Sequence, residues 1–159
     1  MIALKIKDIR AFTNHLLREN TFNCYDFIEG DITTFVQYHI NGYIQQAFFS
    51  EDENISEYSA WEKLQAHCFT LIKGNRAPLN FKFVLRLNEM NNKRFLAKVN
   101  EGKEEQYHLY LNIRYEQQEL TCITGTASNT FSLDKSIEHA WDQEVQSFLL
   151  NCNIDAELC

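Results

Sequence analysis

The sequence predicts a single-domain α+β protein in which helices cover one face of a mostly antiparallel sheet of about six to seven strands. Residues Tyr107–Tyr115 alternate between apolar and polar side chains, a period of two that is typical of a half-buried strand. A two-residue turn at Gln117-Gln118 then places Leu120, at the start of a second strand, opposite Tyr115. From Ser132 the apolar residues recur with helical spacing, so a long helix should cover this hairpin.

The N-terminal third predicts one strand, one helix and three further strands. Ile2–Ile6 alternates, and Asp8 is a good N-cap for a helix that runs to about Arg18. Strands are then expected at residues 22–28, 32–40 and 43–48, with one turn at Glu29-Gly30-Asp31 and a hairpin turn at Asn41-Gly42. Both faces of the 32–48 hairpin are mixed, so the sequence leaves open which face is buried.

The middle of the chain continues with two helices and a strand. Ser59 and Glu62 fit a capping box that starts a helix, and Gly74 is suited to end it. Leu79–Leu87 alternates as a strand, and Glu89–Val99 has the weaker pattern of a third helix. A charged loop is expected at residues 100–106.

The resulting order is β-α-β-β-β-α-β-α-β-β-α. One domain should span residues 1–150, and residues 151–159 should form a frayed C-terminal tail. An alternative is a rolled sheet closed by the last helix, as in a pleckstrin-homology barrel, although the first two helices interrupt that pattern. Strand order in the sheet stays open.

Composition narrows the class of function. The chain has 159 residues, 45% hydrophobic residues and a net charge of −7. Such an acidic surface disfavours binding to nucleic acid or to an anionic membrane. No apolar run is long enough for a signal peptide or a membrane span, and five widely spaced cysteines are best explained as free thiols. We therefore expect a cytoplasmic protein.

Known cofactor and metal motifs are missing from the sequence, which contains no G-x-G-x-x-G, P-loop, H-E-x-x-H or EF-hand pattern. We expect no cofactor and no metal site. Asp134, Glu138 and Asp142 are spaced along one helix face and could bind a divalent cation, but a solvated face is the better interpretation. The hydroxyl-rich run Thr124–Thr130 could bind an anion, or it could continue the strand up to a helix N-cap at Ser132.

Several longer runs are similar to a family of small uncharacterised proteins from anaerobic Gram-positive bacteria. They are residues 1–6, 71–76, 111–115, 120–122 and 133–142, so the resemblance covers nearly the whole chain. The resemblance supports a single domain of bacterial origin. It implies no activity, cofactor or catalytic residue.

The candidate ligand site is the outward side of the two clearest strands. That side carries no acidic residue and presents basic, aromatic and amide groups, namely Lys82, Arg86, His108, Tyr110, Asn112 and Arg114 (Val84 and Asn80 complete it). If the two strands share a sheet, these side chains form a basic and aromatic surface on an acidic protein. Arginine forks suit carboxylate or phosphate, so a small anionic ligand or an acidic partner segment is expected there.

The sequence favours a binding or interaction module over an enzyme, without excluding the latter. An acidic dimeric adaptor or chaperone is one version, and its partner would be another protein or a second copy. The competing class is a small-molecule enzyme, which needs a closed pocket with a polar cluster of perturbed pKa. An adaptor instead needs an exposed apolar patch or a free strand edge.

Overall fold

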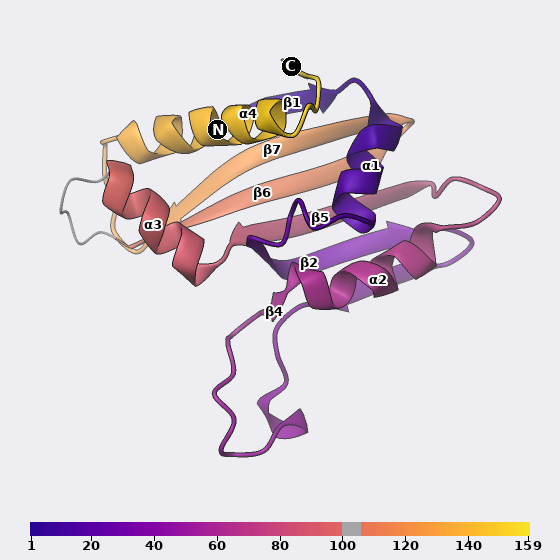
Figure 1. Cartoon of the computed structure of the whole chain (residues 1–159), viewed down its shortest axis with the longest axis horizontal. Coiled ribbons are helices and arrows are strands. Elements are labelled where there is room, and N and C mark those ends of the chain that lie inside the picture. The colour runs from indigo at the N-terminus through magenta and orange to yellow at the C-terminus, as the bar shows by residue number, and fades with distance from the viewer. Residues whose placement is uncertain (100–105) are drawn as a thin grey trace.

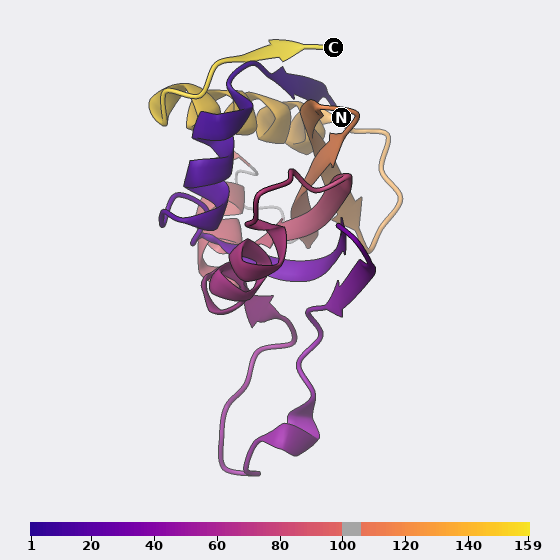
Figure 2. The ribbon, with the colours of Figure 1, turned by 90° about the vertical axis from the view of Figure 1, so that its right-hand side faces the viewer.

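The computed structural model describes residues 1–99 and 106–159, and it contains an antiparallel sheet with helices on one face (Figures 1 and 2). The strands are β1 (Ala3–Ile6), β2 (Tyr25–Thr33), β3 (Gln37–Asn41), β4 (Ser59–Ala60), β5 (Asn80–Leu87), β6 (Tyr107–Glu116), β7 (Glu119–Ser128) and β8 (Ala156–Leu158). The helices are α1 (Ile9–Leu17), α2 (Trp61–Ile72), α3 (Glu89–Val99) and α4 (Ser136–Asn151), with a short 3-10 turn at Gln46–Phe48. The predicted α+β class is confirmed.

The eight strands form an open sheet. Their order is β3-β2-β5-β6-β7-β1-β8, and the short strand β4 pairs with β2. Because β3 and β8 lie at opposite edges, the described strands do not close into the barrel considered as an alternative. Alternate residues of β2, β5, β6 and β7 point towards the helices and form the core with the two tryptophans.

The central hairpin follows the predicted register. Tyr115 lies opposite Leu120, and Ile113 lies opposite Cys122. The turn residues Gln117 and Gln118 both have positive φ angles, 52° and 62°, as a two-residue hairpin turn requires. Strand β7 is longer than predicted, because the hydroxyl-rich run continues to pair with β6 as far as Ser128.

Helix α4 covers this hairpin, as predicted, but it begins at Ser136 rather than Ser132. Leu133, which the helical pattern placed on the buried stripe, is 86% exposed in the segment before the helix. Trp141 is buried, and its indole Nε1 donates a hydrogen bond of 3.0 Å to the Tyr110 carbonyl of β6. This indole fixes the helix on the hairpin.

The prediction of three strands between residues 22 and 48 is wrong. Strand β2 runs through the expected turn at Glu29-Gly30-Asp31, and its hairpin with β3 turns at residues 34–36 instead. Gly30 lies in mid-strand. Any larger residue would clash there, because a Cβ would approach ring atoms of Phe83 and Phe27 to 2.6 and 2.8 Å. This glycine makes room for aromatic rings and does not turn the chain.

Asn41-Gly42 does not form the expected hairpin. Gly42 ends β3 and lies so close to β2 that a Cβ would be 1.9 Å from the Phe27 carbonyl oxygen. Its amide donates to the Ile28 carbonyl at 2.8 Å. The chain then leaves the sheet and returns at Tyr58, which forms an isolated bridge with Tyr43.

The start of α2 and the C-terminal tail also differ from the prediction. Ser59 does not cap α2, because it lies in β4 and its hydroxyl donates to the Ala60 carbonyl. The predicted frayed tail at 151–159 instead forms β8 on the edge of the sheet, beside β1. Asp8, by contrast, caps α1 as predicted, since its carboxylate accepts from the Ala11 amide at 3.0 Å. Most of the loop predicted at 100–106 lies outside the described residues.

Across the described chain, none of the helices combines the length and apolarity that crossing a bilayer requires.

Candidate functional site

The six residues of the predicted ligand surface lie on one open face of the sheet. Strands β5 and β6 are neighbours, with Lys82 opposite Arg114 and Arg86 opposite Tyr110. Residues directly opposite in an antiparallel pair point to the same side. His108 and Asn112 share the parity of Tyr110 along β6, so the sheet brings all six to the same face.

The neighbouring strand β2 adds acidic residues to this face. Asp31 lies opposite Lys82, and Asp26 lies opposite Arg86. On β6 itself, Arg114 forms an ion pair with Glu116. The open face therefore carries charges of both signs on neighbouring strands. Its basic area is smaller than the sequence of β5 and β6 alone suggested.

A cavity lies where one end of the open face meets α3. Arg86 and His108 line this cavity of about 370 Å³ together with Asp26 and Glu57. The Arg86 guanidinium lies 4.9 Å from the centre of the Tyr58 ring. The pKa of His108 is lowered, first by burial and then by the nearby Arg86. Lys82, Tyr110, Asn112 and Arg114 lie outside this cavity, so ligand binding by all six residues stays a prediction.

The acidic ridge considered for a cation is not a solvated face throughout. Asp142 is only 7% exposed, and its Oδ1 accepts a hydrogen bond from the Thr124 hydroxyl. Glu138 and Asp142 each bind the Met1 ammonium group at 3.1 Å. Among the described residues, no group of three acidic, histidine or cysteine side chains could bind a metal ion.

Three cysteines have thiols that burial holds in the neutral form. Burial raises the pKa of Cys24 to about 11 and that of Cys68 to about 12. The pKa of Cys122, which is fully buried in β7, is raised further by the same cause. A thiol is a nucleophile only as the thiolate, so burial makes these three side chains unreactive near neutral pH.

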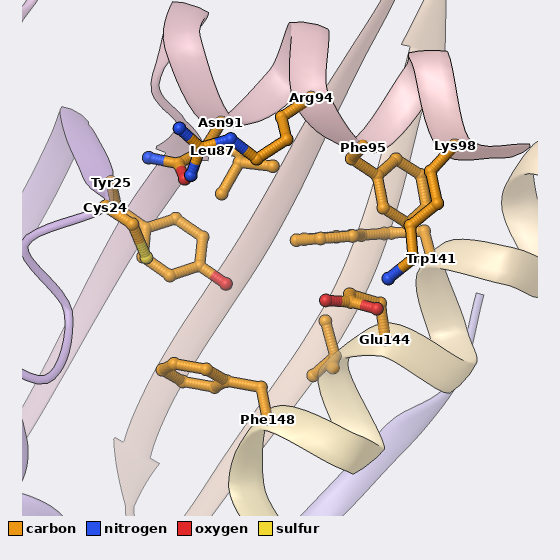
Figure 3. A pocket seen from close by; sticks show the side chains of 11 residues that line it. Cys24, Tyr25, Leu87, Asn91, Arg94, Phe95, Lys98, Trp141, Glu144 and Phe148 are labelled. Atoms are coloured by element: carbon orange, nitrogen blue, oxygen red, sulfur yellow. The ribbon is translucent and has the colours of Figure 1, made fainter. Parts of the chain in front are cut away.

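A second cavity, of about 260 Å³, lies on the other side of the sheet between α3 and α4 (Figure 3). Tyr25 and Leu87, paired across β2 and β5, form its floor. Each helix lines it with residues spaced i, i+3, i+4 and i+7, which is one face of a helix. These residues are Asn91, Arg94, Phe95 and Lys98 of α3, and Trp141, Glu144, Val145 and Phe148 of α4. We call this space the helix cavity.

Aromatic contacts hold the walls of the helix cavity in place. Phe95 and Trp141 meet edge to face, with ring centres 5.6 Å apart, and so connect α3 with α4. At the other end Phe148 meets Tyr25 edge to face at 6.3 Å. Rings locked in this way form a preformed apolar cavity, the usual setting for a small-molecule site.

The Tyr25 hydroxyl is the unusual group in the helix cavity. Its side chain is 2% exposed, and Figure 3 shows the hydroxyl oxygen pointing into the space between the helices. No hydrogen bond joins this hydroxyl to another described residue, and its oxygen is open to the cavity, since it is not among the fully buried unpaired polar atoms. Burial raises its pKa well above the usual value, so it remains a neutral hydrogen-bond donor.

Charged side chains surround the mouth of the helix cavity. Arg94 and Lys98 extend from α3, and the Glu144 carboxylate on α4 points towards the Tyr25 hydroxyl. All three charged residues are exposed, and none forms an ion pair with another described residue. Two cations face one anion, so the mouth carries a small excess of positive charge.

Sequence reasoning did not find the helix cavity. The alternation of β2 and the stripes of α3 and α4 identified buried faces, but not a gap between them. One signal was present, because Arg94 and Lys98 share with Phe95 the same face of a weakly amphipathic helix. A basic group on a helix face that should be buried is a sign of a polar site.

The model of a family of unknown function, DUF5721, matches residues 15–157. No curated protein and no solved structure matches the chain.

Proposed function

The chain belongs to this family of unknown function, and we propose from the geometry of the helix cavity that it is a binding module for a small amphipathic carboxylate. The observation that carries the proposal is Tyr25, a buried side chain whose hydroxyl is directed into a preformed apolar cavity and makes no hydrogen bond to another described residue. A ligand acceptor in the cavity can accept a hydrogen bond from this hydroxyl in an apolar setting, where such a bond is strong.

The class of ligand follows from the walls and the mouth. Leu87, Phe95, Trp141 and Val145 favour an aromatic or short aliphatic body. The neutral Tyr25 hydroxyl donates a hydrogen bond, and the cations Arg94 and Lys98 also favour an anionic acceptor. A carboxylate satisfies all three groups, while Glu144 disfavours a second negative charge on the ligand.

Binding fits this cavity better than catalysis. The two cavity groups with shifted pKa values, Tyr25 and Cys24, are both held in their neutral forms by burial. A nucleophile or a general base needs a pKa closer to the working pH. The surrounding charges therefore serve recognition of a ligand.

The test compares Tyr25→Phe with Tyr115→Phe. Binding of phenylacetate, hexanoate and benzylamine is measured by ligand-observed NMR at about 1 mM, a range that detects weak ligands. We expect the two carboxylates to bind and to lose about tenfold in affinity in Tyr25→Phe, because one hydrogen bond to a charged group is lost. Tyr115, stacked on Phe81, is the matched control.

Stability gives the second readout of the same variants. Because the Tyr25 hydroxyl makes no hydrogen bond to another described residue, Tyr25→Phe should leave the free energy of unfolding nearly unchanged without ligand. If none of the probes binds, or if their affinity is the same in Tyr25→Phe, the proposal is wrong. Preferential binding of the cation benzylamine would show that the Glu144 carboxylate selects the ligand. That result would overturn the assignment of a carboxylate ligand.

A further inference from the structure

A long excursion between β3 and β4 projects away from the sheet and helices (Figures 1 and 2). We call residues 42–58 the arm. Its base is held by the bridge between Tyr43 and Tyr58, whose rings meet edge to face at 5.7 Å. Near its tip, Phe48 is 85% exposed and packs edge to face on Phe49.

The tip of the arm is acidic as well as aromatic. Glu51, Asp52 and Glu53 follow the phenylalanines after one intervening serine, Ser50. All three are exposed, and none forms an ion pair with another described residue; Glu53 accepts a hydrogen bond only from the Ser50 amide. Exposed aromatic residues beside unpaired charges are typical of a docking segment.

A groove of the opposite character lies at the far end of α2. It has a volume of about 590 Å³ and runs between the turn of the β2–β3 hairpin and the segment that joins α2 to β5. Its apolar surface includes Phe35, which is 88% exposed, and Leu79, which is 68% exposed. Lys73 and Arg76 supply its charge, and no acidic residue lines it.

The groove cations are free to meet an acidic partner. Neither Lys73 nor Arg76 forms an ion pair within the described chain, although the Lys73 ammonium lies 5.7 Å from the centre of the Phe69 ring. The arm joins the body near the start of α2, and the groove lies at its end. A helix of 12 residues separates the two by roughly 18 Å, and the arm points away from the body.

We propose that the occupant of the groove is the arm of a second copy of this chain. Phe48 and Phe49 would pack on Phe35 and Leu79, while the acidic triplet would face the basic groove residues Lys73 and Arg76. The complementarity of charge and apolar surface argues for this occupant, because neither element has a partner of this kind among the described residues of its own chain. Since every copy carries both elements, a two-fold dimer makes the contact twice.

The experiment exchanges the charges of the two surfaces. The arm variant carries Glu51→Lys, Asp52→Lys and Glu53→Lys, and the groove variant carries Lys73→Glu and Arg76→Glu. All five positions are exposed, and circular dichroism confirms that each variant folds. Sedimentation velocity at about 0.1 mM then measures the mass of wild type, of each variant and of their equimolar mixture.

We expect wild type to be a dimer whose dissociation constant rises with salt, as exposed charge contacts are screened. Each variant alone has arm and groove of the same sign and should be monomeric. In the mixture, the basic arm meets the acidic groove and the acidic arm meets the basic groove, so a heterodimer should form.

A hydrophobic variant gives an independent check. Phe48→Ser should raise the dissociation constant at least about tenfold, as for the loss of a central aromatic anchor. Phe131→Ser is the matched control, because Phe131 is 92% exposed and belongs to neither surface. A monomeric wild type overturns the proposal, as does a dimer that both charge variants retain or a mixture that stays monomeric.

Discussion

At the scale of single residues, two buried tryptophans fix the fold, because each combines a large apolar ring with one N–H donor. Trp61 is fully buried, and its Nε1 donates to the Leu16 carbonyl at 3.1 Å, which ties α2 to α1. Trp141 does the same for α4 and β6. The hydrogen-bond acceptors of the two indoles could not be predicted from the sequence. Those acceptors are carbonyls 45 and 31 residues away.

Trp141→Ala tests this anchoring. The variant should lose about 3–5 kcal/mol of unfolding free energy, because it leaves a large void beside Phe95 and removes the hydrogen bond to the Tyr110 carbonyl. Urea denaturation measures the loss. Phe131→Ala, at a position that is 92% exposed, should change the free energy by less than about 0.5 kcal/mol. A Trp141→Ala protein as stable as this control would show that α4 is held elsewhere.

Cys68 gives a pH-dependent prediction. Its pKa is raised from 9.0 to about 12, so above pH 9 the unfolded chain releases a proton that the folded chain keeps. Stability from this group is complete below pH 9 and falls as pH rises towards 12, by about 1.4 kcal/mol per pH unit. Cys68→Ala should reduce this slope, whereas Cys159→Ala, at an exposed position, should leave it unchanged. Unfolding curves between pH 8.5 and about 10.5 test the difference; equal slopes in both variants would contradict it.

At the scale of elements, alternation and helical periodicity predicted the strands and helices that fill one face of the sheet. Helix α3 has the bounds expected from its pattern, and β5 and the central hairpin differ by one or a few residues. Gly74 follows the end of α2 as predicted, but the two predicted glycine turns failed. Gly30 and Gly42 are present because aromatic rings and a neighbouring backbone approach them, and such approaches depend on strands distant in sequence. For the same reason the helix cavity, which lies between elements, was not predicted.

The turn between β6 and β7 leads to a stabilising substitution. Gln118 has a φ angle of 62°, where a residue with a Cβ is strained and glycine is not. Gln118→Gly should therefore raise the unfolding free energy by up to about 1 kcal/mol. Gln45→Gly is the control, because its φ of −80° gains nothing from glycine and the added freedom of the unfolded chain should lower stability. Thermal midpoints that fall in both variants would contradict the prediction.

The C-terminal strand β8 was not predicted, because the last residues of the chain are mostly polar. Ile154 is 4% exposed, and β8 after it pairs with β1. Ile154→Ala should lose about 2–4 kcal/mol of unfolding free energy, as for other buried aliphatic truncations. Leu150→Ala, at a position that is 72% exposed, should lose far less. Equal losses from the two truncations would mean that the terminal segment does not pack on the sheet.

At the scale of the whole molecule, the two faces of the sheet differ in kind. One is covered by helices that leave a cavity with apolar walls, and the other presents charged side chains in rows of opposite sign. The sequence predicted the outward side chains of β5 and β6 correctly as a set. It could not show that β2 would align Asp26 and Asp31 with Arg86 and Lys82, because strand order was not readable.

Ligand binding on the open face should be weak and should depend on salt. With the charges of Arg86 and Arg114 partly offset by Asp26 and Glu116, a small anion should bind there only weakly and only at low ionic strength. We expect phosphorylated and carboxylated metabolites to raise the thermal midpoint slightly in about 0.01 M salt and not in 0.15 M, where charges are screened beyond about 8 Å.

Two arginine variants identify where such an anion binds. Arg86 and Arg114 lie roughly 14 Å apart along the paired strands, so a small anion contacts only one of them, and only the Arg→Ala variant at that position should abolish the shift at low salt. The helix cavity supplies the internal control, since Arg94→Ala lies on the opposite side of the sheet and should leave the shift intact. A shift that survives both open-face substitutions but disappears in Arg94→Ala would place the anion in the helix cavity and leave the open face as scaffold.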